Sequence, residues 1–174
     1  GYVGGRLIPL LLDKGYTVRA GARSARKLEC RPYAGHERLE IAACDVFDRD
    51  SLVTALKDCE VAYYLVHSMA TTKKPGHVDF AQKDRVAAEN MIWAAGQTEG
   101  LTRIIYLGGL GEDSPELSHH LRSRAETGQI LQKGPVPLTW LRAAMILGAG
   151  SASFEIMRYL VEHLPVMITP TWVR

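Results

Sequence analysis

Apolar residues recur along the chain in two alternating patterns. A continuous apolar run from Val61 to Val66 is typical of a central strand in a parallel sheet, which is buried on both faces. In the segment 78–95, the residues of one face instead recur at the three- and four-residue spacing of an amphipathic helix. The residues that share this helical face are Val86, Asn90, Met91 and Ala94.

Applied to the whole chain, these two patterns predict a regular alternation of strands and helices. Strands are predicted over residues 16–20, 38–43, 61–66, 103–107 and 137–141, and Gly108-Gly109 end the fourth of them. Helices are predicted over 4–14, 48–57, 78–95 and 117–132, with one more helical stripe over 154–164. The alternation predicts an α/β fold with a doubly wound parallel sheet.

The N-terminal residues have the spacing of a phosphate-binding loop. Gly1 and Gly4 match the last two glycines of a dinucleotide motif, so we expect its first strand and first glycine to lie upstream. The backbone N–H groups of Gly1, Tyr2, Val3 and Gly4 would then hold a pyrophosphate at the start of a helix. The alternative is a plain turn from strand to helix.

The end of the second strand of the expected sheet indicates which nicotinamide cofactor fits. An NAD-dependent protein usually carries Asp or Glu there to bind the ribose 2′-hydroxyl. This chain has Arg23-Ser24 instead, with Arg26 and Lys27 close by and no carboxylate. A forked guanidinium contact suits a 2′-phosphate, which predicts NADP(H) in preference to NAD(H). A solvated basic loop is the alternative interpretation.

Further cofactor contacts are predicted where the other strands end. Asp45 can accept from the adenine amino group with Val46 against the ring, or it can belong to the cap of the helix near Asp48. His67 can contact the ribose or a substrate, or it can be a structural residue. We also place Val66 and Gly108 in the cofactor site, because both stand at strand ends.

Composition narrows the class of protein. The chain has 174 residues, of which 47% are hydrophobic and 23% charged, as in an ordinary globular protein. A net charge of +2 argues against a nucleic-acid surface, and no apolar stretch has the length of a membrane span. Cys30, Cys44 and Cys59 lack metal-ligand spacing, so we expect free thiols, no metal site and a cytoplasmic location.

Five runs of sequence carry a resemblance to a known family. They are Gly1-Tyr-Val-Gly-Gly-Arg-Leu-Ile-Pro9, Tyr63-Tyr-Leu-Val-His-Ser-Met69, Arg103-Ile-Ile-Tyr-Leu-Gly-Gly-Leu-Gly111, Leu121-Arg-Ser-Arg-Ala-Glu126 and Leu141-Arg-Ala-Ala144. The chain resembles atypical extended short-chain dehydrogenase/reductases, more narrowly the NmrA-like members often labelled nucleoside-diphosphate-sugar epimerases. The resemblance implies an NAD(P)-binding Rossmann domain over 1–150 and the start of a substrate-binding part over 151–174. It also implies, by analogy, a homodimer.

The chain departs from this family at the catalytic positions. Active members pair a Tyr with a Lys four residues later and add a Ser or Thr at a strand end. Here His120 and Arg124 stand at the first two positions, and Gly108-Gly109 replace the hydroxyl. His120 can act as an acid or base, and Arg124 can orient a ribose or a substrate anion. Alternatively, both line the crevice without taking part in chemistry.

Three functions are compatible with these residues. The first is an NADPH-dependent oxidoreductase acting on a small carbonyl or quinone. The second is a non-catalytic NADP(H) sensor or scaffold without a substrate, which the loss of the Tyr and Lys favours. Sugar-nucleotide epimerisation ranks third, because reversible oxidation at a sugar carbon depends on a Tyr-like base.

Overall fold

The computed structural model describes residues 1–66, 80–110, 118–144 and 146–166. Their contacts divide the chain into two compact units. The first holds nearly all of residues 1–143, and the second begins at Ala144. Each unit is described by itself below, and the predicted division into domains at residue 150 stays a prediction.

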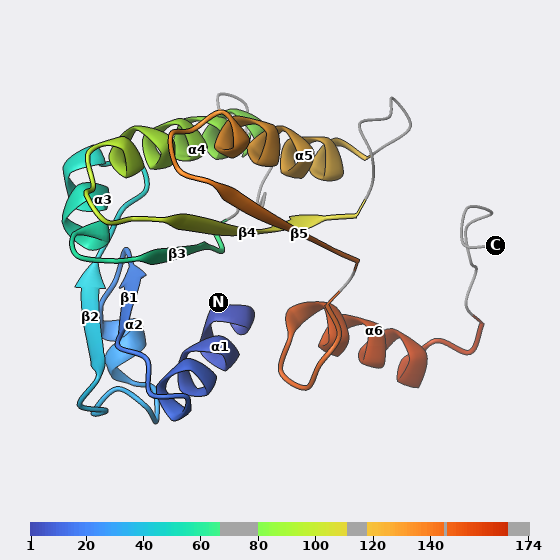
Figure 1. The fold of residues 1–174 in the computed structure, drawn as a ribbon. Coiled ribbons are helices and arrows are strands. Elements are labelled where there is room, and N and C mark those ends of the chain that lie inside the picture. The colour runs from blue at the N-terminus through green and yellow to red at the C-terminus, as the bar shows by residue number, and fades with distance from the viewer. Residues whose placement is uncertain (67–79, 111–117, 145, 167–174) are drawn as a thin grey trace. The chain divides into compact units, whose positions relative to one another are not determined.

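Strands and helices alternate through the first unit, as Figure 1 shows. The helices are α1 (Tyr2–Asp13), α2 (Arg26–Glu29), α3 (Arg49–Leu56), α4 (Phe80–Gly96) and α5 (His119–Gln132). The strands are β1 (Val18–Ala22), β2 (Leu39–Ala43), β3 (Val61–Tyr64), β4 (Arg103–Gly109) and β5 (Leu138–Ala143). This order confirms the predicted α/β fold. The short helix α2 has no counterpart in the prediction.

All described strand pairs are parallel, and they form two sheets. One sheet pairs β1 with β2, and the other has the order β3-β4-β5. The prediction that Gly108 and Gly109 end their strand is wrong, because they pair with Arg142 and Ala143 of β5. Glycine continues the ladder here since its backbone N–H and C=O remain available for pairing. A further strand ahead of Gly1 stays a prediction.

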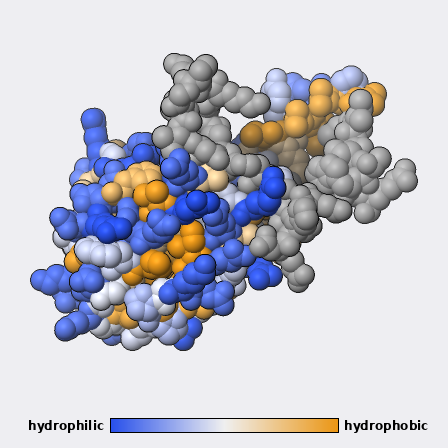
Figure 2. Space-filling model, turned by 90° about the horizontal axis from the view of Figure 1, so that it is seen from above, coloured by the Kyte–Doolittle hydropathy of each residue, from blue (hydrophilic) through white to orange (hydrophobic). Residues whose placement is uncertain are grey.

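The main core lies between the three-stranded sheet and two helices, α4 and α5, which cover one of its faces (Figure 1). Side chains on β3 alternate, with Ala62 and Tyr64 buried and Val61 and Tyr63 exposed. Figure 2 views the first unit from the side of α4 and α5, where hydrophilic residues surround smaller apolar areas. Val86 lies at the exposed margin of the buried stripe of α4. This stripe consists of Asp84, Ala87, Ala88, Asn90, Met91, Ala94 and Ala95.

Local signals explain where several elements begin and end. Gly15 follows α1 with a φ of +87°, a left-handed conformation that favours glycine and is typical of a helix end. Asp48 caps α3 by accepting hydrogen bonds from the N–H groups of Asp50 and Ser51. Ser118 caps α5 in the same way through the N–H group of Leu121.

The described part of the second unit contains one helix, α6 (Ala152–His163), which confirms the predicted helical stripe. Ser151 caps it by accepting from the N–H of Phe154 at 3.2 Å. Arg158 forms ion pairs with Glu155 at 2.9 Å and with Glu162 at 3.9 Å on its polar side. Apolar side chains on the helix, including Ile156, are exposed within this unit.

A candidate dinucleotide site

The start of α1 is a helix N-terminus that no side chain caps among the described residues. Gly1 is the N-cap residue and offers no side chain, and the first turn contains no acidic residue. The backbone turns directly into the helix, with the N–H of Gly5 donating to the carbonyl of Gly1 at 3.0 Å. Such an end carries partial positive charge and N–H donors, which together bind phosphate.

The surroundings of the first two glycines leave room for a ligand. Among the described residues, a Cβ on Gly1 would meet nothing within 4 Å, and one on Gly4 would meet only Leu65 at 3.7 Å. Packing within the described part of the chain therefore does not require glycine at either position. Close approach of a ligand to the backbone gives a physical reason for both, so the residues present fit a pyrophosphate.

A cationic cavity, shallow and largely open to solvent, lies beyond the end of β1. It has a volume of about 580 Å³ and is lined by Ser24, Arg26, Lys27, Cys30 and Arg31. Arg23 precedes this set and is exposed. Three positive side chains around one cavity favour a multiply charged anion such as a phosphate monoester. Arg31 was not anticipated from the sequence, because it stands eight residues after the predicted forked contact.

The turn after β2 uses its polar groups to fix its own backbone. Oδ1 of Asp45 accepts from the N–H of Phe47 at 3.0 Å, while Asp48 is the residue that caps α3. Val46 packs against the core, and its carbonyl accepts from Nδ2 of Asn90 at 3.0 Å. Asn90 thus anchors this turn to α4, a role that the sequence pattern did not indicate. The predicted adenine contacts of Asp45 and Val46 remain predictions.

Arg124 holds the ends of two strands together. Its guanidinium donates to the carbonyl of Val66 at 3.2 Å and to the carbonyl of Leu107, and the side chain is buried. It also lies 5.0 Å from the ring of Tyr106, whose hydroxyl donates to the backbone carbonyl of Arg124 at 2.9 Å. This arrangement can position backbone at the carboxyl edge of the sheet.

The two tyrosines beneath this region belong to the core. Tyr64 and Tyr106 are buried, and their rings lie 5.9 Å apart. Burial raises the pKa of Tyr106 to about 12, although the nearby Arg124 acts in the opposite direction. Burial also raises the pKa of Tyr64 above its ordinary value. Neither phenol can exchange protons near neutral pH.

The predicted catalytic pair shares one helix but not one environment. His120 is exposed in the first turn of α5, whereas Arg124, one turn later, is buried. His67 lies outside the described residues. The structure brings Val66 into contact with Arg124, but it does not test the chemistry of His120, which stays a prediction.

The glycine pair in β4 leaves no space for the hydroxyl side chain of active relatives. A Cβ on Gly108 would clash with Nε1 of Trp140, and one on Gly109 would approach Cδ2 of Leu121 to 2.8 Å. The same indole ring would clash with a Cβ on Gly128 of α5. Trp140 therefore occupies the space between strand and helix that a Ser or Thr would need.

Other side-chain chemistry is limited in the described part of the chain. Cys30 is exposed, Cys44 and Cys59 are partly buried, and all three are free thiols, as predicted. Burial raises the pKa of Cys44. No cluster of three metal-ligating side chains occurs in the described ranges. None of the described helices combines the length and hydropathy needed to cross a membrane.

Comparison with known proteins identifies the family to which the chain belongs. The profile of the NAD(P)H-binding family matches residues 1–151. The chain therefore belongs to the NAD(P)H-binding family, which confirms the expected Rossmann-type cofactor domain. No curated protein is significantly similar to the sequence.

Solved structures share the fold at low identity. A nucleoside-diphosphate-sugar epimerase from Staphylococcus aureus has a TM-score of 0.70 at 20% identity, over 93% of this chain and 52% of its own. Triphenylmethane reductase from Citrobacter sp., complexed with NADP(H), has a TM-score of 0.69 at 19% identity. The match covers 93% of this chain and 52% of the reductase. The Bordetella bronchiseptica enzyme WbmH, in complex with NAD⁺, has a TM-score of 0.66 at 18% identity. The match covers 91% of this chain and 58% of WbmH. The chain thus spans about half the length of these relatives.

Proposed function

We propose that this chain is the NADP(H)-binding part of an oxidoreductase that reduces a small carbonyl or quinone. The observation that carries the proposal is the cationic cavity lined by Arg26, Lys27 and Arg31 beyond the end of β1. A 2′-phosphate distinguishes NADPH from NADH, and three cations around one cavity would discriminate on that group.

Each part of the site has a defined task in this proposal. The N–H groups at the start of α1 bind the pyrophosphate, and the cavity binds the 2′-phosphate. A charge-assisted hydrogen bond contributes about 1.5–3 kcal/mol, and about 1.4 kcal/mol corresponds to a tenfold change in affinity. One or two such contacts would give NADPH a preference of about tenfold or more. The nicotinamide, when bound, supplies the hydride.

The protein's own contribution to chemistry is mainly positioning. Arg124 fixes the backbone at the ends of β3 and β4, where a ligand would lie in a sheet of this class. His120, exposed one turn before it, is the proposed proton donor. A quinone is a suitable acceptor because it can also take its proton from water.

Two structural neighbours are consistent with this proposal without deciding the cofactor. The triphenylmethane reductase is complexed with NADP(H), whereas WbmH is complexed with NAD⁺. The fold accommodates either dinucleotide, so the choice must come from local residues. The cationic cavity supports NADP(H).

Binding of NADPH and NADH to the full-length protein, measured by calorimetry at fixed salt, tests the proposal. Lys27→Ala and Arg31→Ala should each weaken NADPH binding about tenfold and leave NADH binding unchanged. Lys14→Ala is the matched control, since this exposed lysine lies at the other end of α1 from the glycines. Equal affinity for the two dinucleotides in the wild type would contradict the proposal.

A second function, a non-catalytic NADP(H) sensor, is favoured by a specific observation. The guanidinium of Arg124 is bonded to two backbone carbonyls, and Trp140 fills the space of the Ser or Thr hydroxyl. NADPH consumption with a panel of quinones and carbonyls separates the two functions. Turnover that His120→Ala abolishes supports the oxidoreductase. Tight NADPH binding without turnover on any acceptor supports the sensor.

A further inference from the structure

None of the described residues forms a hydrogen bond with the hydroxyl group of Tyr33. This oxygen is buried. It lies beside the first turn of α1, since a Cβ on Gly5 would be 3.9 Å from it. The phenol is therefore next to the glycines that begin the helix.

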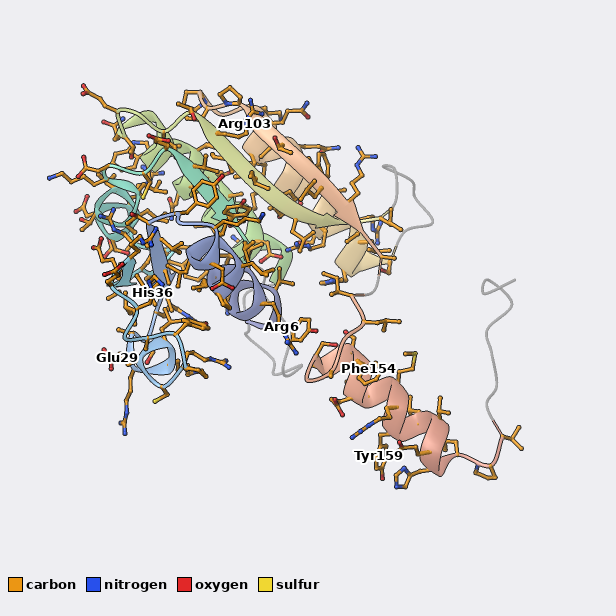
Figure 3. The ribbon with its side chains drawn as sticks, turned by 60° about the horizontal axis from the view of Figure 1, so that its bottom comes forward. Arg6, Glu29, His36, Arg103, Phe154 and Tyr159 are labelled. Carbon is orange, nitrogen blue, oxygen red and sulfur yellow. The ribbon has the colours of Figure 1, made fainter. Side chains whose placement is uncertain are left out.

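The backbone around Tyr33 is fixed by successive turns. The N–H of Ala34 donates to the carbonyl of Arg31 at 3.0 Å, and the N–H of His36 donates to the carbonyl of Tyr33 at 3.1 Å. The N–H of Leu39 then donates to the carbonyl of His36 at 2.9 Å and leads into β2. In Figure 3, Glu29 and His36 mark the two ends of the segment that carries Tyr33. The position of the hydroxyl thus follows from ordered local structure.

A buried hydroxyl without a partner destabilises a protein, whereas a phenylalanine ring would pack equally well. A ligand that brings an acceptor atom removes that penalty. The groups near Tyr33 favour an anionic ligand, because α1 presents an uncovered N-terminus and Arg31 lines the cationic cavity two residues before Tyr33. Phosphate oxygens are the acceptors that such a ligand supplies.

We infer that Tyr33 is a cofactor-binding residue whose hydroxyl donates a hydrogen bond to a phosphate oxygen of the dinucleotide. This inference rests on the proposed function, because it takes the dinucleotide as the ligand of the α1 start. The phosphate is either the pyrophosphate common to both nicotinamide cofactors or the 2′-phosphate that only NADPH carries. The hydrogen-bond chemistry is the same in both cases.

Tyr33→Phe in the full-length protein tests the inference with two measurements. The melting temperature of the cofactor-free variant should equal or exceed that of the wild type, because the unpaired hydroxyl is gone. The affinity for NADPH, measured by calorimetry, should fall about tenfold. A loss for NADPH alone identifies the 2′-phosphate as the acceptor, and an equal loss for NADH identifies the pyrophosphate. Tyr16→Phe, at an exposed tyrosine, is the matched control and should change neither quantity.

Two results would overturn the inference. One is unchanged cofactor affinity of Tyr33→Phe in a protein whose wild type binds NADPH. The other is a lower melting temperature of the cofactor-free variant, which would show that the hydroxyl has a partner within the protein. A wild type that binds neither dinucleotide instead contradicts the proposed function, so the two failures are distinguishable.

Discussion

The region beyond β1 and the region around α5 differ in what their polar groups do. Arg26, Lys27 and Arg31 line a cavity, and the nearby hydroxyl of Tyr33 has no described partner. By contrast, Arg124 donates to carbonyls of the protein itself, and Trp140 fills the space beside Gly108. The first region offers charge to a ligand, whereas the second uses it for packing. One domain can therefore combine a region whose cations line an open surface with a region whose cation is bonded to its own backbone.

The largest expected effect comes from removing the guanidinium of Arg124. Arg124→Ala leaves the carbonyls of Val66 and Leu107 without their donor, and each such loss costs about 1–3 kcal/mol. We expect the free energy of unfolding in urea to fall by about 3 kcal/mol with or without NADPH. Arg122→Ala, at an exposed position of the same helix, should be nearly neutral. Unchanged stability with lost turnover would place Arg124 among the reactive groups and break the comparison.

Restoring the hydroxyl of active relatives should harm this protein. Gly108→Ser places a Cβ against Nε1 of Trp140, and overpacking of this kind costs about 1–3 kcal/mol. We expect a lower melting temperature and no gain in NADPH turnover. Gly35→Ser is the control, because a Cβ there meets nothing within 4 Å among the described residues. A stable and more active Gly108→Ser variant would contradict this view of the glycine pair.

The buried phenol of Tyr106 should make stability depend on pH in the alkaline range. Its folded pKa of about 12 exceeds an unfolded value of about 10, so the folded state retains the proton longer. This contribution is complete below pH 10 and is lost towards pH 12, at about 1.4 kcal/mol per pH unit. Between pH 10 and pH 12, the free energy of unfolding of the wild type, measured with denaturant, should fall more steeply with pH than that of Tyr106→Phe. The difference between the two slopes should equal this value. Parallel pH profiles would rule out the assigned burial.

The smallest expected effect concerns salt. Because the cavity is open to solvent, its attraction for a 2′-phosphate is screened by ions. Raising ionic strength from about 0.05 to 0.3 M should reduce the preference for NADPH over NADH a few-fold, since the Debye length falls from roughly 14 to 6 Å. Calorimetric titrations with NADPH and NADH at both ionic strengths measure this change in preference. A salt-independent preference would locate discrimination outside this cavity.

The sequence predicted most strands and helices because their patterns are strong over many residues. Val61 to Val66 has no polar interruption, and β3 occupies its first four residues. Helix α2 was missed because its four residues contain no apolar repeat and no capping side chain. The extension of β4 through Gly109 was missed for a different reason. Pairing with β5 decides it, and that partner lies more than 25 residues away in sequence.

The site shows the same division between local and distant information. The glycines at the start of α1 and the basic residues after β1 are local motifs, so their positions followed from spacing. Tyr33 beside Gly5 and Asn90 beneath Val46 depend on contacts 28 and 44 residues apart, which no single segment encodes. Arg124 was identified, but its bonds to strand ends required the sheet to be assembled.

The position of Trp140 provides an optical reporter of the packing between α5 and the sheet. Its indole lies against Gly108 and Gly128, with the guanidinium of Arg142 4.8 Å above the ring. Indole emission responds to polarity and to nearby charge, so separation of α5 from β4 would change the emission maximum and the intensity of Trp140 fluorescence. Opening of this half of the domain can therefore be followed without an added label, using Trp140→Phe to isolate the signal.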